Sequence, residues 1–529
     1  MWTVIVRSDH KAPAHTRGGA ASLGSVGSPW RPWTVLVWAT LLVTILMSFR
    51  PAVPVVWGDT PSFVESALRT LEAGRPIVTG GRDPGYPTFL AVTFALGGDL
   101  GTVVRLQQAA WVVLMLVLAM AAQAATRNAG GLVPVILVAT YPGLLLFRNV
   151  VTADLLFAVF LNLATAGLLV AACIDGAARC WLLAASILCA GFAACLRSQG
   201  LLVPIAAILI GVYLARPATA ARRAVMAVSV ATVLALMLAG SRFGASNSDQ
   251  ASAVFVPKTL FCNHLNIALA SDAARREIVS QAADRADAAM ARLAADFAAE
   301  PGRWPVLGFF GDVCLFDTEL DRDLAGKTGN ALSAAAAYWR IFLAAVRDRP
   351  LAYAGKFVRQ MAYGLSSAWP PYGLEPAIPI STDDVPHVSE IMTRHGRAVQ
   401  PIDLQGGPVR IGLLSDFPGM SAYLFKALSA AFVVAVIFWT VAAVRRRRPA
   451  FVTRAGIVIA MWAASIATAA AAHTLDVSRY LIPAVPMVGL MLSLCAVELT
   501  ATIRADHAAP SATVRRAMRS GPRSGSSVS

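Results

Sequence analysis

The sequence predicts an all-α, polytopic membrane protein with about ten (8–12) transmembrane helices. The chain of 529 residues is 57% hydrophobic and 14% charged, and its mean hydropathy is +0.62. Because soluble domains carry about 25% charged residues, a water-soluble enzyme is excluded. Apolar runs near the length of about 20 residues that a helix needs to cross a bilayer recur along the chain.

Ten apolar runs are expected to span the membrane. They are Trp33–Phe49, Thr102–Ala125, Leu132–Phe147, Ala153–Cys173, Trp181–Leu196, Leu201–Ala215, Ala224–Gly240, Ala422–Val444, Gly456–Ala472 and Leu481–Leu499. A shorter apolar segment, Tyr86–Leu96, is typical of a re-entrant or interfacial piece.

The distribution of charge predicts the orientation of these spans. The net charge is +15, yet Arg242 to Met420 holds 17 basic and 19 acidic residues, so the positive excess lies elsewhere. It occupies short segments between apolar runs, such as Arg445 to Arg448, which is the pattern of cytoplasmic loops. No basic patch is interleaved with aromatic residues, so nucleic acid is not an expected partner.

The predicted organisation has five parts. They are a cytoplasmic basic tail (1–32), an N-terminal transmembrane module (33–241) with a first outer loop (51–101), an outer-face loop domain (242–420), C-terminal transmembrane helices (421–500) and a second cytoplasmic basic tail (501–529). The loop domain is expected to be mainly helical and irregular, with helices at Ala334–Val346 and Ala352–Gly364 and irregular chain at Trp369–Pro379. No N-x-Ser/Thr sequon occurs in the outer loops, which favours a bacterial inner membrane.

Two of the seven cysteines, Cys262 and Cys314, share the large outer loop, where an oxidising compartment permits a disulfide. A disulfide and two free thiols are both open alternatives for this pair. The other cysteines lie in or near the spans and are interpreted as small apolar residues.

Ionisable residues close to the spans gather on the outer side of this topology. They are Asp59, Arg82, Asp83, Arg148, Asp154, Arg197, His473, Asp476 and Arg479. Charges near the hydrocarbon are costly and indicate function by default. The alternative for each residue is an interfacial side chain that pairs with a neighbour or reaches the lipid headgroups.

Asp59 is the strongest candidate for a catalytic residue. It precedes Pro61 and an apolar stripe of Phe63, Val64, Ala67, Leu68 and Leu71, which predicts a helix along the membrane surface with the carboxylate at its positive end. An ionised carboxylate there is suited to act as a general base for a hydroxyl group. The alternative is that Asp59 or Thr60 caps the helix.

The first outer loop then turns back towards the membrane. Glycines and prolines in Gly80-Gly81-Arg82-Asp83-Pro84-Gly85-Tyr86-Pro87 predict the turn, and Arg82 is placed to pair with a phosphate oxygen.

The order of these motifs resembles the C-type glycosyltransferases (GT-C). The motifs are a first span, an outer Trp-Gly-Asp before an amphipathic helix, the Gly-Arg-Asp-Pro-Gly-Tyr-Pro return, the Thr-Ala-Asp that ends at Asp154, and Ser478 to Pro483. The likeness covers roughly the first 215 residues and this closing motif, and it is greatest to bacterial enzymes similar to protein O-mannosyltransferases and the lipid A aminoarabinose transferase.

The resemblance implies roles for residues at matching positions. Asp59 corresponds to the catalytic carboxylate, Asp154 to a second acidic residue, and Arg82, Arg148, Arg197 and Arg479 to arginines that contact the donor phosphate. Asp83, Tyr86, His473, Asp476 and Tyr480 are further candidates. Many family members have two adjacent acids in the first loop, whereas Gly58 and Thr60 flank Asp59 here, so participation of Mg²⁺ or Mn²⁺ is left open.

The implied activity is inverting transfer of a sugar from a polyprenyl-phosphate donor to a lipid, glycan or protein acceptor. The site is expected to face the periplasm, both termini are expected to be cytoplasmic, and membrane lipids are expected to surround the protein. One alternative is an O-antigen ligase or polymerase, for which His264, His387, His395 and Arg340 are the relevant outer residues. Another is a transporter or lipid flippase, although neither a midplane charge nor a repeat is present.

Overall fold

The computed structural model is helical, and no strand occurs in the part of the chain that it describes. That part comprises residues 32–47, 53–79, 81–215, 220, 223–224, 226–235, 250–277, 295, 312–315, 318–324, 331–365, 384–397, 418–445, 448–473 and 480–519.

Six helices among the described residues are long and apolar enough to cross a membrane. They are α4 (Leu100–Thr126), α7 (Asp154–Ala171), α8 (Ala177–Leu196), α19 (Pro418–Val444), α20 (Pro449–Ala472) and α21 (Val485–Arg519). Four shorter apolar stretches are Trp33–Met47 within α1 (Pro32–Met47), Ala129–Ala139, Ser198–Leu214 with α9 (Leu202–Leu214), and Met226–Ala235. Six helices of spanning length are thus found where about ten were expected.

The predicted span over 132–147 is wrong as one continuous helix. The structure divides this region into η1 (Ala129–Leu132), α5 (Val133–Ala139) and α6 (Pro142–Phe147). Pro142 has no backbone N–H to continue a helix, and it also disfavours the helical conformation of the residue before it.

Helix α7 lies at the centre of the bundle and packs between α4 and α8. Its close approach to α8 depends on Gly167, because a Cβ there would lie 2.3 Å from Ser186 Oγ. The amide of Asn162 donates to the carbonyl of Pro483, 2.8 Å away, and so joins α7 to η7 (Ile482–Ala484). These contacts hold the middle and the second half of α7 in the bundle, and Asp154 is the first residue of this helix.

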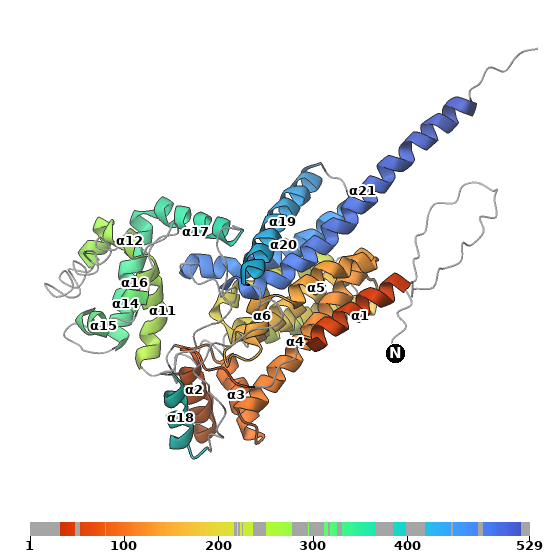
Figure 1. The fold of residues 1–529 in the computed structure, drawn as a ribbon. Coiled ribbons are helices and arrows are strands. Elements are labelled where there is room, and N and C mark those ends of the chain that lie inside the picture. Colours follow the sequence, from red (N-terminus) through yellow and green to blue (C-terminus); the bar gives the residue numbers. More distant parts are fainter. Residues whose placement is uncertain are drawn as a thin grey trace, which may run out of the picture.

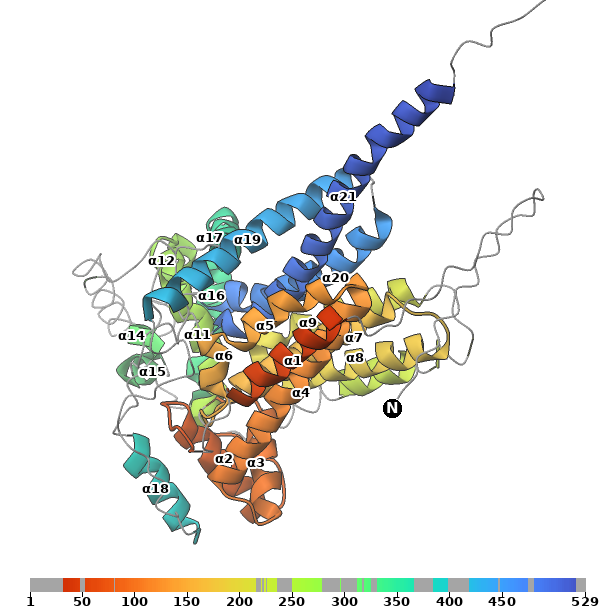
Figure 2. The same cartoon turned by 45° about the vertical axis from the view of Figure 1, so that its right-hand side comes forward.

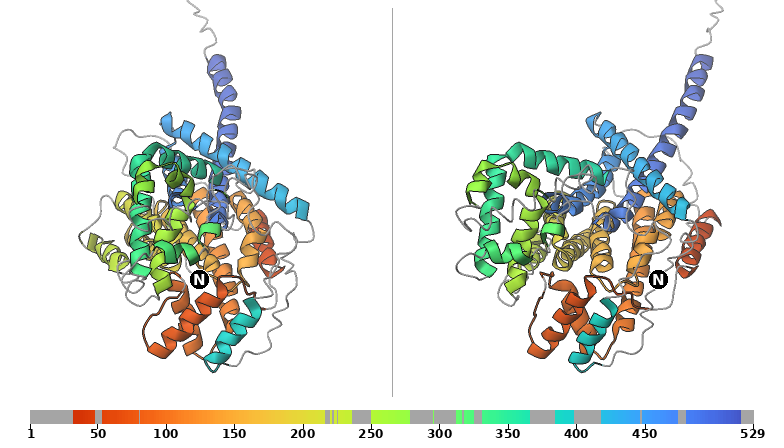
Figure 3. Two further views of the ribbon diagram at one scale, coloured as in Figure 1. Left: turned by 90° about the vertical axis from the view of Figure 1, so that its left-hand side faces the viewer. Right: turned by 60° about the vertical axis from the view of Figure 1, so that its left-hand side comes forward.

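The predicted first-loop helix is present as α2 (Thr60–Ala73). Its apolar stripe is buried against protein, and Phe63 packs on Tyr86 of α3 (Gly85–Ala95) with ring centroids 5.0 Å apart. A helix from the large outer segment, α18 (Asp384–Arg394), packs against α2 as well (Figure 3). Helix α2 is therefore enclosed between two protein elements.

A second hydrophobic core lies within the described part of the range 242–420. This core joins α11 (Gln250–Asn263), α12 (Leu265–Leu269), α14 (Asp312–Leu315), α15 (Thr318–Leu324) and α16 (Ala331–Asp348). Cys262 and Cys314 form a disulfide within it, with Cα atoms 5.5 Å apart. Helices α16 and α17 (Pro350–Gly364) appear where helices were expected, whereas Trp369–Pro379 lies outside the described residues.

Figure 1 shows the helices of this core to one side of the bundle, with α2, α3 and α18 grouped at one end. Figure 2 shows the same grouping after a turn of 45°. The range 242–420 does not share one core in its described part, because Val388, Ile391 and Met392 of α18 belong to the main core of the bundle. The large outer segment thus supplies one wall of the region around Asp59.

Candidate active site

A short contact between distant segments brings the two candidate carboxylates to the same end of the bundle. Val55 and Val150 form a parallel bridge, in which the amide of Val55 donates to Asn149 O at 2.8 Å and the amide of Val151 donates to Val55 O at 3.0 Å. Asp59 and Asp154 each follow this bridge by four residues.

Asp59 occupies the N-cap position of α2, but its side chain makes no capping hydrogen bond. Thr60 accepts a hydrogen bond from the Trp57 amide at 2.9 Å and donates to Val151 O at 3.0 Å. Asp59 Oδ1 instead lies 2.8 Å from Arg82 Nη2. Thr60 therefore anchors the start of the helix, and the Asp59 carboxylate is left to the ion pair.

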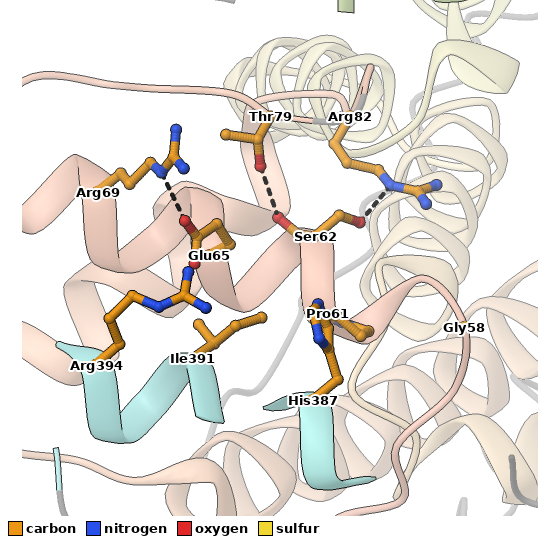
Figure 4. Close-up of a pocket in the computed structure, with 10 residues that line it drawn as sticks. All are labelled: Gly58, Pro61, Ser62, Glu65, Arg69, Thr79, Arg82, His387, Ile391 and Arg394. Atoms are coloured by element: carbon orange, nitrogen blue, oxygen red, sulfur yellow. Dashed lines mark hydrogen bonds and ion pairs between the residues drawn. The ribbon is translucent and has the colours of Figure 1, made fainter. Parts of the chain in front are cut away.

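Arg82 connects this carboxylate to a polar cavity of about 520 Å³ (Figure 4). Its Nε donates to Ser62 Oγ at 2.7 Å, and its guanidinium lies 5.3 Å from the centroid of the Phe63 ring. The cavity lies between α2, the return loop and α18, and is lined by Gly58, Pro61, Ser62, Glu65, Arg69, Thr79, Arg82, His387, Ile391 and Arg394. Each of its three arginines has an acidic partner, because Arg82 pairs with Asp59, Arg69 with Glu65 and Arg394 with Glu390.

A second cluster is centred on Arg197. Its guanidinium forms an ion pair with Asp154, whose side chain is 2% exposed, and lies 5.1 Å from the centroid of the Tyr480 ring. Asp83 accepts a hydrogen bond from the Ser198 amide at 2.6 Å. Burial raises the pKa of the Asp83 carboxyl against the opposing effects of the Ser198 amide and Arg197.

The two clusters are joined by consecutive residues. Arg82 reaches Asp59, and the next residue, Asp83, reaches the chain beside Arg197. Gly81 makes this turn possible, since its φ of +69° lies in the left-handed region and a Cβ there would lie 2.4 Å from Phe255 Cγ. The return loop therefore fixes both acid–arginine pairs relative to each other.

Other predicted residues lie at different depths. Arg148 is 1% exposed and lies over Trp111, 4.8 Å from the ring centroid, while Tyr86 is fully buried and donates to Gln107 Oε1 at 2.7 Å. The His473 ring packs on Tyr480 with centroids 5.2 Å apart. Asp476 and Arg479 lie outside the described residues.

Sequence reasoning missed Arg69 and Arg394 as lining residues of the cavity. Arg69 lies one turn after Glu65 and pairs with it at 2.7 Å, a spacing that reads as an ordinary exposed pair. Arg394 comes from α18, and no local pattern indicates that this helix packs on α2.

The outer histidines considered for a ligase lie in three environments. His387 lines the cavity, and His395 Nε2 lies 3.5 Å from Glu65. His264 is buried beside Lys356, 3.0 Å from Nε2 to Nζ, and burial lowers the pKa of its imidazole to about 3. Arg340 lies 3.9 Å from Glu277 on the outer segment.

Within the described ranges, no group of three or more His, Cys, Asp and Glu side chains is arranged to hold a metal ion. Asp59 and Asp154 each have an arginine as ion-pair partner. We therefore derive no catalytic step that uses Mg²⁺ or Mn²⁺ from these residues.

Comparison with known proteins yields matches among solved structures, whereas no protein-family model and no curated protein matches the chain. The chain is similar to ArnT from Cupriavidus metallidurans, solved in the apo state and bound to undecaprenyl phosphate. Identities are 14% and 15%, coverage is 87% of this chain and 77% of ArnT, and the TM-score is 0.31 in both cases.

It is also similar to the archaeal oligosaccharyltransferase AglB from Archaeoglobus fulgidus in complex with an inhibitory peptide and a dolichol-phosphate. Here the identity is 12%, coverage is 93% of this chain and 53% of AglB, and the TM-score is 0.39, so the chain spans about half the length of AglB. Both likenesses are distant in sequence and in structure.

Proposed function

We propose that this protein is a membrane glycosyltransferase that moves a sugar from a polyprenyl-phosphate donor to an acceptor hydroxyl at the outer face. The observation that carries the proposal is the Asp59–Arg82 ion pair, 2.8 Å long, at a cavity of about 520 Å³ that Arg69, Arg82 and Arg394 line. A base and a phosphate-binding cation are the two groups that such a transfer needs at one place.

Asp59 is the general base in this proposal. The acceptor oxygen attacks the anomeric carbon of the sugar, and its proton passes to the Asp59 carboxylate. The bond between that carbon and the phosphate oxygen breaks, and its electron pair leaves with the phosphate. Attack from the face opposite the phosphate inverts the configuration of the anomeric carbon.

Arg82 binds the phosphate in this proposal. A phosphate at Arg82 competes with Asp59 for the guanidinium and favours release of the carboxylate from the ion pair. Asp59 then becomes a better proton acceptor when donor is bound. Arg148, at 1% exposed, lies deeper than Arg82, which lines the cavity, so Arg82 is the first arginine to test.

The experiment measures release of undecaprenyl phosphate from a panel of undecaprenyl-phosphate sugars by the protein in liposomes. Asp59→Asn is expected to lower the rate at least about 100-fold, the low end for loss of a general base. Asp99→Asn is the matched control, because Asp99 caps α4 and asparagine caps helices equally well. Wild-type activity in folded Asp59→Asn protein would refute the proposed base.

A further inference from the structure

A second cavity, of about 1060 Å³, lies at the other end of the same helices. The end of α7 forms its floor through Val170, Cys173 and Ile174. Arg127 and neighbouring residues at the end of α4 form one wall, and Trp181 with its neighbours at the start of α8 forms the other. Helices α4 and α8 each pack on α7, so the cavity lies between them over its last turn.

This cavity lies one membrane thickness away from the candidate active site. Asp154 opens α7 and Cys173 follows its end. At 1.5 Å of rise per residue, the 18 residues of α7 span about 27 Å, close to the hydrocarbon thickness of about 30 Å. The cavity therefore lies at the opposite border of the membrane, the border predicted to face the cytoplasm.

The lining is apolar apart from one polar end. Alanine, valine, leucine, isoleucine and tryptophan supply most of it, and Trp181 is 68% exposed. An open apolar cavity at the flank of a membrane helix bundle is suited to a hydrocarbon chain, because burying the chain there costs no desolvation of polar groups.

The polar end of the lining carries Arg127, and two further arginines lie near it. Arg127 is exposed, and Arg179 Nε donates to the carbonyl oxygen of Ile174, a lining residue, at 2.7 Å. Arg454 reaches α4 through a hydrogen bond from Nη1 to Ala125 O at 2.8 Å. Asp175, which pairs with Arg179, is 92% exposed. Positive charge thus lies where a lipid phosphate would sit.

We propose that this cavity binds an anionic phospholipid of the cytoplasmic leaflet, with the phosphate at Arg127 and Arg179 and an acyl chain over the end of α7. Basic pockets between transmembrane helices on this side recognise anionic headgroups. The donor lipid is a different molecule at a different place, because its phosphate must reach Asp59 at the other end of the bundle.

The test compares phosphatidylglycerol with phosphatidylcholine of identical acyl chains. The full-length protein is purified in detergent, each lipid is titrated, and bound lipid is counted by native mass spectrometry. Wild-type protein is expected to bind phosphatidylglycerol more tightly. At about 1 kcal/mol per arginine, Arg127→Gln is expected to weaken phosphatidylglycerol binding about fivefold, and to weaken phosphatidylcholine binding less, because the choline ammonium offsets the charge of its phosphate.

Two further variants test separately how the cavity and the arginine charge contribute to lipid binding. Ala185→Trp places a bulky side chain in the cavity lining and is expected to reduce binding of both lipids. Arg445→Gln removes an arginine at the end of α19, away from the cavity lining, and is expected to change nothing. Equal binding of the two lipids by wild-type protein, or an equal loss in Arg445→Gln and Arg127→Gln, would overturn the proposal. Binding of glycerol 3-phosphate as tight as that of phosphatidylglycerol would show a site for phosphate alone and would also overturn the proposal.

Discussion

Neutralising one member of the Asp154–Arg197 pair is expected to destabilise the protein strongly. The side chains of Asp154 and Arg197 are 2% and 12% exposed, so either charge becomes buried without its partner when the other is removed. Such a loss costs about 3–5 kcal/mol. Asp154→Asn is expected at the low end, because Asp83 remains near Arg197 and offsets part of its charge.

The double variant isolates the interaction energy between Asp154 and Arg197 from the contacts that each side chain makes with the rest of the protein. Asp154→Asn with Arg197→Gln removes both charges and leaves two amides that can form a hydrogen bond. The two single losses add to about 6–10 kcal/mol, and the double variant is expected to lose at least about 2 kcal/mol less than that sum. The assay is unfolding in mixed micelles of mild detergent and SDS, followed by tryptophan fluorescence. Additive single losses would refute the electrostatic coupling.

The same variants test whether Asp154 takes part in the reaction. If either charged group touches substrate, the double variant regains stability relative to the summed single losses, while transfer remains lost. Transfer restored together with stability would show that neither charge takes part in the reaction and that the pair acts on stability alone.

Three further predictions follow from the outer segments. The pKa of His264 is about 3 in the folded protein and about 6.5 in the unfolded chain, so the unfolded chain binds more protons between these two pH values. The free energy of unfolding therefore falls as the pH drops from 6.5 to 4. His264→Phe is expected to remove about 3 kcal/mol of this fall, measured as the free energy of unfolding at each pH. The Cys262–Cys314 bond closes a separation of 52 residues, so Cys262→Ala with Cys314→Ala is expected to cost about 4 kcal/mol in the same assay. Gly81 has a positive φ, and a Cβ there would lie 2.4 Å from Phe255 Cγ, so Gly81→Ala is expected to lower the melting temperature. Gly396→Ala is the control and is expected to have a smaller effect, because Gly396 also has a positive φ but a Cβ there would meet no atom within 4 Å.

Local periodicity explains which parts of the fold the sequence predicts. The stripe from Phe63 to Leu71 repeats with the helical period after Pro61, and α2 occupies Thr60–Ala73. The same hydropathy argument fails over 132–147, because it measures how apolar a segment is and gives no weight to Pro142. A correct prediction for that segment has to consider the backbone N–H that Pro142 lacks as well as the hydropathy of the side chains.

Long-range contacts explain what the sequence cannot predict at the site. The Val55–Val150 bridge joins segments 95 residues apart, and neither segment carries a local pattern that specifies its partner. The docking of α18 on α2 likewise depends on apolar residues, Val388 and Ile391, that would suit many other surfaces. Asp59 could be chosen as a candidate from its position alone, but its pairing with Arg82 and the contribution of Arg394 required the fold.

The scarcity of charge is the reason that so much of the candidate site could be chosen from the sequence. A charged side chain near hydrocarbon is retained only where a partner or water compensates it, so each one carries information that a charge on a soluble surface lacks. The structure places these charges at two levels. Acid–arginine pairs formed by Asp59 and Asp154 lie at one end of α7, and Arg127, Arg179 and Arg454 lie near the cavity at the other end. The first level contains bases and is suited to chemistry, whereas the second has cations in excess beside an apolar cavity and is suited to holding a lipid phosphate.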